Sequence, residues 1–447
     1  MPVPTVTPRT CELAPGEPTA GEPTSVESAT GAGRLMNMET MAQRLERELR
    51  DGPTLDAYLL AAGISQIVDD HLHASTHPFG DAARYLHGGD TLPIRLAGRA
   101  AAAIDAAGRW ARRRRAAFRA ALCWRVQLDL LLVALAREQV NALVKAGPSA
   151  STETEARTPG LVPLHARTMP RLPDLRPLPL ALREAVVKLP ACFSHCDQRL
   201  ADIVSLAQRF ATRRPDRQRP LLVVGVRTSG SYLAPLCAAS LATIGYRRVQ
   251  AATVRPGHRL LRAERALVEA VVREDGLALV LDDPPVTGGS VRRAAVELER
   301  AGLRHASIVL ALATAGAAEL PAALRDFEAV LLAGDEWSVC NDLAPVAVRR
   351  TLQALAPAGR RIVAVRPVPM PVPAQARGHH RALFEVRTQD AVRGPQRRLV
   401  LAEGAGVGYL AAHRIAAPEL VAQFSPPVLG LRDGLLYREW LPSNRRL

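Results

Sequence analysis

The sequence predicts an α/β protein whose central part is built around a parallel β-sheet. Short, almost wholly apolar runs are expected as strands, and apolar or amphipathic helices separate them. Strands of this composition are buried on both faces, so the intervening helices must cover the sheet on two sides. The expected strands lie at residues 221–224, 248–254, 277–283, 306–312 and 327–332.

Two helices of this central part have clear limits in the sequence. An apolar helix is expected from Leu233 to Ile244 and ends at Gly245. An amphipathic helix is expected from Ser290 to Arg300 and is closed by Gly302. Its apolar face carries Val291, Ala294, Ala295 and Leu298.

The remaining chain is divided by composition. A chain of 447 residues is expected to form two or three domains, because a single core seldom grows past roughly 300 residues. Residues 36–147 have a helical pattern and predict an all-α domain ahead of the α/β domain at 186–356. Disorder is expected at 1–35, linkers at 148–185 and 357–378, and a small β-rich segment at 379–447.

The net charge of +15 suggests nucleic acid or an anionic membrane as a partner. Lys145 and Lys188 are the only lysines, however, so the charge reflects a general use of arginine. The basic run from Arg112 to Arg115 could bind phosphates, but a solvated or internally paired helix face is the preferred interpretation. Nucleic acid is therefore not an expected partner.

Cysteine usage and targeting signals predict a cytoplasmic protein. The N-terminus lacks the basic and apolar regions of a signal peptide. The longest apolar run, from Leu128 to Ala136, is too short to span a bilayer, so no membrane association is expected. Six scattered cysteines in a chain of this length are expected to be free thiols.

Two groups of potential metal ligands have simpler explanations. Cys192 and Cys196 flank His195, but no second Cys/His pair lies at a useful spacing, so coincidence is preferred over a metal half-site. Asp69-Asp70-His71 with His73 could hold a metal from one helix face. A solvated face with ordinary i,i+4 pairing is the preferred interpretation.

The most informative segment is Leu277-Ala-Leu-Val-Leu-Asp-Asp-Pro-Pro-Val-Thr-Gly-Gly-Ser. A buried strand delivers the carboxylates of Asp282 and Asp283 to its C-terminal end, where ligands bind in open parallel sheets. The turn at 287–290 then opens a helix, and backbone N–H groups at a helix start bind anions. Together these features suit a sugar phosphate, with its phosphate in the turn and its vicinal hydroxyls on the acids.

This segment resembles the motif with which type I phosphoribosyltransferases bind 5-phosphoribosyl-1-pyrophosphate (PRPP). In that family an apolar strand is followed by an acidic pair, a short spacer and Thr-Gly-Gly-Ser or Thr-Gly-Gly-Thr. The upstream segment Val223-Val-Gly-Val-Arg-Thr-Ser-Gly is similar to the family's pyrophosphate loop. The resemblance covers roughly residues 186–345 and implies a phosphoribosyltransferase-like parallel-sheet domain.

The resemblance also implies roles for individual residues. Asp282 and Asp283 would bind the ribose hydroxyls, partly through Mg²⁺, and Arg255 would neutralise the leaving group from a mobile loop between Val254 and Val271. That loop also carries His258, Arg259, Arg262 and Arg265. The pyrophosphate would be held by Arg227, Thr228, Ser229 and Gly230, and the 5′-phosphate by Val286, Thr287, Gly288, Gly289 and Ser290.

Two features complicate the resemblance. Pro284-Pro285 occupies the spacer, where the family has apolar or β-branched residues, and proline removes N–H donors. Trp337 lies where a base-contacting segment is expected and could stack on the acceptor's ring. A packed core tryptophan is an equally good interpretation.

The C-terminal segment weakly resembles the N-lobe of kinase-like phosphotransferases. Its signals are the glycine turn Gly404-Ala-Gly-Val-Gly and a hinge-like strand from Tyr437 to Leu441. The strand around Leu399 carries no lysine, and no catalytic loop follows. No kinase activity is therefore expected from this chain.

The sequence thus predicts Mg²⁺-dependent transfer of phosphoribose between PRPP and a nitrogenous, nucleobase-like acceptor, or the reverse reaction. The alternative is a catalytically silent regulatory or scaffold protein that binds PRPP or a nucleotide. Proteins of this fold class often pair, which allows a homodimer.

Overall fold

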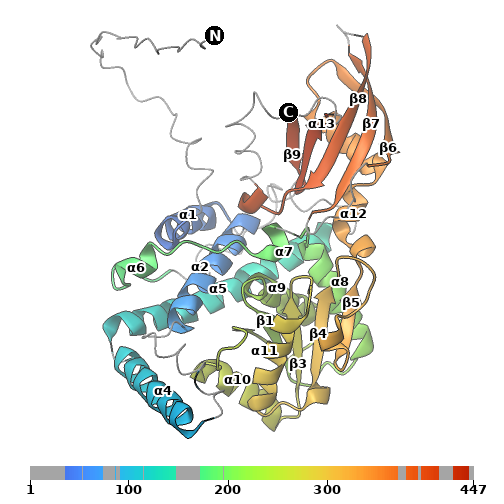
Figure 1. Cartoon of the computed structure of the whole chain (residues 1–447). Coiled ribbons are helices and arrows are strands. Elements are labelled where there is room, and N and C mark those ends of the chain that lie inside the picture. The colour runs from blue at the N-terminus through green and yellow to red at the C-terminus, as the bar shows by residue number, and fades with distance from the viewer. Residues whose placement is uncertain are drawn as a thin grey trace, which may run out of the picture.

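A five-stranded parallel sheet lies at the centre of the computed structural model (Figure 1). The structure describes residues 36–52, 54–73, 86, 91–113, 115–146, 172–194, 196–370, 379–390, 394–411 and 426–441. The sheet has the order β2-β1-β3-β4-β5 and confirms the predicted α/β class. Its strands are β1 (Leu221–Val226), β2 (Val249–Val254), β3 (Leu277–Asp282), β4 (Ile308–Ala313) and β5 (Glu328–Leu332).

Helices cover both faces of this sheet. One face packs on α8 (Leu200–Arg213) and α9 (Gly230–Thr243), and the other on α10 (Arg262–Arg273) and α11 (Gly289–Arg300). Strands β1, β3 and β4 are buried along their whole length, as their apolar runs predict. The expected apolar face of α11 is confirmed, since Val291, Ala294, Ala295 and Leu298 are all buried.

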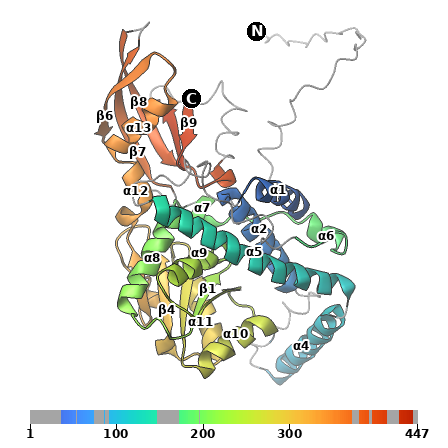
Figure 2. The same ribbon diagram turned by 180° about the vertical axis from the view of Figure 1, so that it is seen from behind.

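The N-terminal helices form a further layer on the same core. They are α1 (Met38–Asp51), α2 (Leu55–His73) and α5 (Ala116–Ala146), and both α2 and α5 pack directly on α9. Figure 2 shows α5 lying across α2 and α9. Because α9 is enclosed by the sheet on one side and these helices on the other, it is apolar all round. The predicted all-α segment therefore shares one core with the sheet.

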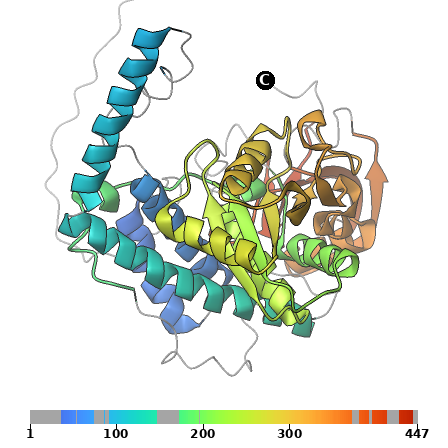
Figure 3. The same cartoon turned by 90° about the horizontal axis from the view of Figure 1, so that it is seen from below.

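One helix extends from this body. Helix α4 (Leu92–Arg113) runs away from the other helices in Figure 3. The residues predicted as disordered, 1–35, lie outside the described part of the chain, as does Arg114 of the basic run. None of the described helices is both long enough and apolar enough to cross a membrane.

The linker predicted at 148–185 is wrong for its described part, residues 172–185. Leu178 and Leu182 are buried in the main core, and the indole N–H of Trp124 donates to the Asp174 carbonyl at 3.1 Å. Short helices α6 (Leu180–Arg183) and α7 (Ala191–Ser194) follow. The prolines of this segment suggested a linker, but its leucines make apolar contacts with the core.

The C-terminal part forms a second, antiparallel sheet with the order β6-β7-β8-β10-β9. Its strands are β6 (Arg360–Val368), β7 (Arg381–Asp390), β8 (Gly394–Gly404), β9 (Val428–Arg432) and β10 (Leu435–Glu439). The sheet packs on α13 (Pro345–Leu355), which follows α12 (Ser338–Asp342). The small β-rich segment is thus confirmed, but β6 replaces much of the linker predicted at 357–378. An edge strand tolerates Pro367, which explains the error.

Buried ionic contacts join the two sheets. The imidazole of His379 donates to Asp197 Oδ1 at 2.6 Å, and the backbone N–H of His380 donates to Oδ2 at 2.5 Å. Burial alone would raise the pKa of Asp197, but these hydrogen bonds lower it to about 2. Burial would likewise lower the pKa of His380, whereas its interaction with Asp197 raises it to about 10. Arg199 adds an ion pair with Asp342.

We expect Asp197→Asn to lower the free energy of unfolding by about 3 kcal/mol, because it leaves buried histidine charge uncompensated. The difference from wild type should be largest between about pH 4 and 6.5. It should shrink as the pH falls toward the Asp197 pKa of about 2 and as it rises through the His380 pKa of about 10. Thermal unfolding across this pH range measures it. The exposed Asp216→Asn is the control, and equal effects of both variants would contradict the prediction.

Candidate functional site

The predicted carboxylate pair lies at the C-terminal end of the central strand. Asp282 is the last residue of β3, and Asp283 follows it directly. Asp282 is 8% exposed, and its Oδ1 accepts a hydrogen bond from the backbone N–H of Asp283 at 2.9 Å. Burial, reinforced by the neighbouring Asp283 charge, holds the pKa of Asp282 well above its usual range. Burial thus favours the protonated form of Asp282, whereas a bound cation would favour its ionised form.

The pair suits a divalent cation that is shared with a substrate. Within the described residues, the carboxylates contact the Ser229 hydroxyl and the Asp283 backbone N–H, and none of the ion pairs there joins them to a basic side chain. The described residues contain no group of three or more His, Cys, Asp or Glu arranged for a metal. Mg²⁺ commonly binds to one or two carboxylates together with substrate phosphates, and Asp282 and Asp283 match that donor set.

The turn after the pair leads into α11 as predicted. Gly288 has a φ of +75° and immediately precedes the helix, and a Cβ at this position would lie 2.7 Å from Leu324. Glycine is thus required both by its backbone conformation and by the space available. Val286 is 70% exposed and Thr287 is also exposed. The first-turn N–H groups of α11, beyond Pro284-Pro285, provide donors for an anion.

The upstream motif forms the connection between β1 and α9. Residues 227–229 make the turn, and α9 begins at Gly230. Gly225 and Gly230 lie backbone against backbone, so a Cβ on either residue would overlap the other. The Arg227–Thr228 peptide bond is cis. Two glycines are therefore needed for this loop to turn back against its own strand.

A hydrogen bond brings the two motifs together. The hydroxyl of Ser229 donates to Asp283 Oδ2 at 3.2 Å and accepts from the backbone N–H of Cys192, also at 3.2 Å. Because β1 and β3 are adjacent and parallel, both loops emerge at the same edge of the sheet. Residues 54 positions apart in the sequence thus meet in one site.

The side chain of Arg227 lies in a buried ionic network beside the end of β2, where its Nη2 donates to the Thr253 carbonyl at 3.4 Å. Its Nη2 is 2.9 Å from Glu264 Oε1, and its Nη1 is 3.7 Å from Asp69 Oδ2. Its guanidinium also contacts His73, whose pKa is lowered mainly by burial. The guanidinium of Arg227, which was predicted to hold pyrophosphate, is therefore already paired with carboxylates of the protein.

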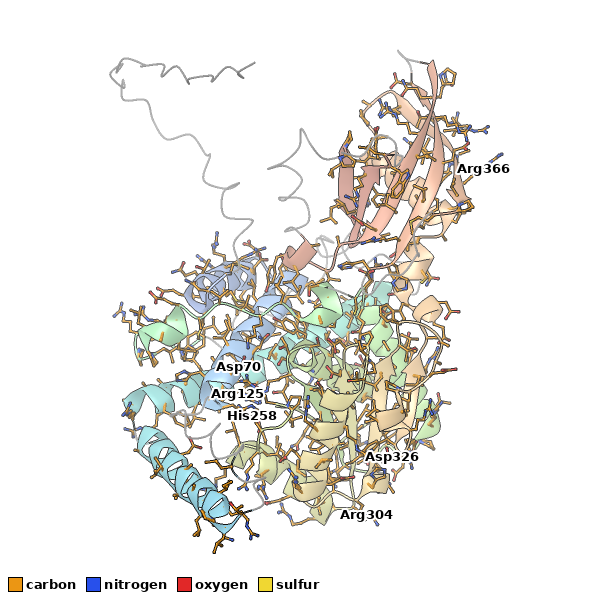
Figure 4. The ribbon with its side chains drawn as sticks, viewed as in Figure 1. Asp70, Arg125, His258, Arg304, Asp326 and Arg366 are labelled. Carbon is orange, nitrogen blue, oxygen red and sulfur yellow. The ribbon has the colours of Figure 1, made fainter. Side chains whose placement is uncertain are left out.

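Asp69 and Asp70 do not form a solvated helix face, and that interpretation is wrong. Asp69 is 1% exposed, pairs with Arg125 and accepts from the Thr253 hydroxyl at 3.1 Å. Asp70 Oδ1 is 2.9 Å from Nη1 of Arg255. Figure 4 marks Asp70 and Arg125 on the helical layer beside His258 of the facing loop. The acidic cluster attaches α2 to the edge of the parallel sheet.

Arg255 follows β2 directly and is partly exposed, so it lies at the same sheet edge as the carboxylate pair. The prediction of a mobile loop between Val254 and Val271 is wrong for most of this segment. Residues 262–273 form α10, and the backbone N–H of Leu261 donates to Glu264 Oε2 at 2.7 Å at its start. Of the arginines expected on this loop, Arg262 and Arg265 lie on the exposed side of α10, whereas Arg259 precedes the helix.

Trp337 is a core residue. It is 1% exposed, its indole N–H donates to the Leu332 carbonyl at 3.4 Å, and its ring lies 5.0 Å from that of His380. The base-stacking interpretation is therefore corrected in favour of the packed one. The apolar strand β5 just before it is the sequence signal for this burial.

The glycine turn of the C-terminal segment is a packing contact. A Cβ on Gly404 would overlap the carboxylate of Asp197, and one on Gly408 would overlap Asp56. The backbone N–H of Tyr409 donates to Asp56 Oδ1 at 2.6 Å. Carboxylates thus occupy the space where the kinase-like resemblance would place phosphates. Gly408 allows the close approach of α2, and Gly404 allows that of the segment before α8.

Cys192 and Cys196 belong to no group of three or more potential metal ligands among the described residues, which do not include His195. Cys192 is buried, and burial raises its pKa well above the usual range. Burial, with the Asp283 charge, raises the pKa of Cys196 to about 12. Burial thus favours the protonated form of both thiols. The side chain of His195 lies outside the described part.

No protein-family model matches the chain, and none of the curated proteins compared with it matches either.

We expect Gly225→Ala to lower the free energy of unfolding by about 2–3 kcal/mol, because the added methyl group overlaps the Gly230 backbone and neither can move aside cheaply. Gly316→Ala is the matched control, since a Cβ there meets nothing within 4 Å. Chemical denaturation measures both variants, and a Gly225→Ala protein as stable as the control would contradict the proposed loop geometry.

Proposed function

We propose that the chain is a phosphoribosyltransferase that acts on PRPP and a nitrogenous, nucleobase-like acceptor with Mg²⁺, in either direction. The observation that carries the proposal is the Ser229–Asp283 hydrogen bond, because it joins the two loops whose sequences resemble the family's PRPP-binding motifs. The arrangement at the sheet edge also favours the proposal. Arg255, the 227–230 loop and the carboxylate pair stand at the C-terminal ends of the neighbouring strands β2, β1 and β3.

In this reaction the C1–O bond to pyrophosphate breaks and a C1–N bond to the acceptor forms, while the acceptor's N–H proton is released. Asp282 and Asp283 would orient the ribose hydroxyls, and the first turn of α11 would hold the 5′-phosphate. Positive charge near the leaving group, from Arg255, would favour its departure. Bound Mg²⁺ would supply further neutralisation of the pyrophosphate charge.

The first test is calorimetric titration of the full chain with PRPP and Mg²⁺. Binding should occur and should be lost in Asp282→Asn/Asp283→Asn, while Asp216→Asn binds as wild type does. Because the pKa of Asp282 is raised by burial and by Asp283, binding should release a proton and strengthen as the pH rises. Titrations in buffers of different ionisation enthalpy measure that proton. Equal binding by the double variant would refute the proposal.

A second test concerns the Asp70–Arg255 ion pair, which competes with an anionic ligand for Arg255. We expect Asp70→Asn to tighten PRPP binding roughly 1.5- to 5-fold, the range of a partly exposed pair. The same substitution in an Arg255→Ala background should have no effect, since the competition is then absent. An equal gain in both backgrounds would show that Asp70 acts by another route.

The runner-up is a catalytically silent protein that binds PRPP or a nucleotide. It is favoured by the internal pairing of Arg227 and by the burial of Trp337, which leave fewer side chains for pyrophosphate and acceptor. Pyrophosphate release across a panel of nucleobases separates the two functions. Turnover with any base rejects the silent alternative.

A further inference from the structure

Helix α4 presents an apolar face to solvent. Leu92, Leu96 and Ile104 are 63%, 53% and 48% exposed, and their spacing of four and eight residues places them on one face of the helix. The alanines at 100, 103 and 107 are also exposed and continue this α4 apolar face. Helices α1, α8, α10 and α11, which are amphipathic as well, bury their apolar faces in the core, whereas α4 leaves its own uncovered.

The opposite side of α4 attaches the helix to the molecule. Gly98, Ala101 and Asp105 are buried, and their spacing places them on the side away from the α4 apolar face. Because this attachment uses two small residues and one carboxylate, the large aliphatic side chains point outward. Figure 3 shows α4 running away from the other helices, and a helix of 22 residues is about 33 Å long. The α4 apolar face is therefore a long and accessible strip.

Positive charge borders this strip. The sequence of α4 contains five arginines and a single acidic residue, Asp105, which lies on the buried side. Arg95 and Arg99 are exposed, and Arg99 follows Leu92 by seven residues, so it lies at the border of the α4 apolar face. The surface thus combines exposed aliphatic side chains with arginines, and a partner that complements it must be both apolar and anionic.

An anionic lipid surface meets both requirements. The interface of a bilayer accepts aliphatic side chains, and its anionic headgroups attract arginines. A second copy of the chain would bring the arginines of two α4 helices together, and nucleic acid would leave the aliphatic side chains in water. We propose that α4 lies flat on an anionic lipid membrane, with the α4 apolar face among the acyl chains and its arginines at the headgroups.

Binding of this kind requires an apolar face and not an apolar length. The absence of a spanning helix among the described residues is therefore compatible with it, and the proposal replaces the expectation of no membrane association. The site is separate from the carboxylate pair and does not depend on the proposed phosphoribosyl transfer.

The test is flotation of the full chain with vesicles of neutral phosphatidylcholine and with vesicles that also contain anionic phosphatidylglycerol. The anionic vesicles should bind the chain more tightly, and salt should weaken that preference. Leu96→Glu should weaken binding roughly ten-fold or more, the range for burial of one leucine side chain. Val346→Glu is the matched control, since Val346 of α13 is 82% exposed.

A second variant, Arg95→Ala/Arg99→Ala, should weaken binding to the anionic vesicles roughly ten- to thirty-fold, the range for two arginines near an anionic surface. Its matched control is Arg349→Ala/Arg350→Ala, on the exposed side of α13. Circular dichroism checks the fold of each variant, and if Leu96→Glu fails to fold, the arginine variant decides.

The proposal is overturned if wild type binds neither kind of vesicle, or if Leu96→Glu binds as tightly as Val346→Glu. A dimer in sedimentation velocity that Leu96→Glu abolishes, without vesicle binding, would assign the α4 apolar face to a second copy. DNA binding that needs Arg95 and Arg99 but not Leu96, again without vesicle binding, would assign the arginines to nucleic acid. Either result would also overturn the proposal.

Discussion

The enclosure of α9 is the constraint on which the remaining structure depends. This helix is buried against the parallel sheet on one side and against α2 and α5 on the other, so it has no solvated face. Its first residue closes the Gly225–Gly230 contact, and its position therefore fixes the loop that brings Ser229 to Asp283. The N-terminal helices thus support the candidate site through α9, although they lie far from it in the sequence.

Buried charge adds specificity to this apolar packing. Arg227 and Arg125 would be costly to bury alone, and Asp69 and Glu264 neutralise them from α2 and α10. Because removing one member leaves the others uncompensated, the network holds the helical layer in one position relative to the sheet edge. Asp197 serves the same purpose at the junction with the second sheet.

The accuracy of the sequence analysis follows the range of the interactions involved. Strands β1, β3 and β4 and helix α11 were predictable because their apolar pattern is local and directly reflects burial. The roles of Asp69 and Trp337 were not, because their burial depends on elements distant in the chain. The glycine turn at 404–408 resembles that of a kinase-like N-lobe, yet glycines also permit close packing, which is their role here. A sequence pattern alone does not distinguish these uses.

The sequence by itself determined the α/β class, the parallel strands and the position of the Asp282–Asp283 pair before a helix start. Each strand and turn follows from its own local pattern, and the parallel arrangement follows from their alternation with helices along residues 221–332. Only the tertiary structure decided that the N-terminal helices share the core, that Arg227 is paired internally while Arg255 faces Asp70, and that the C-terminal sheet packs on α13. These features depend on which apolar faces meet and on which buried charges must then be neutralised, and both are properties of the folded chain.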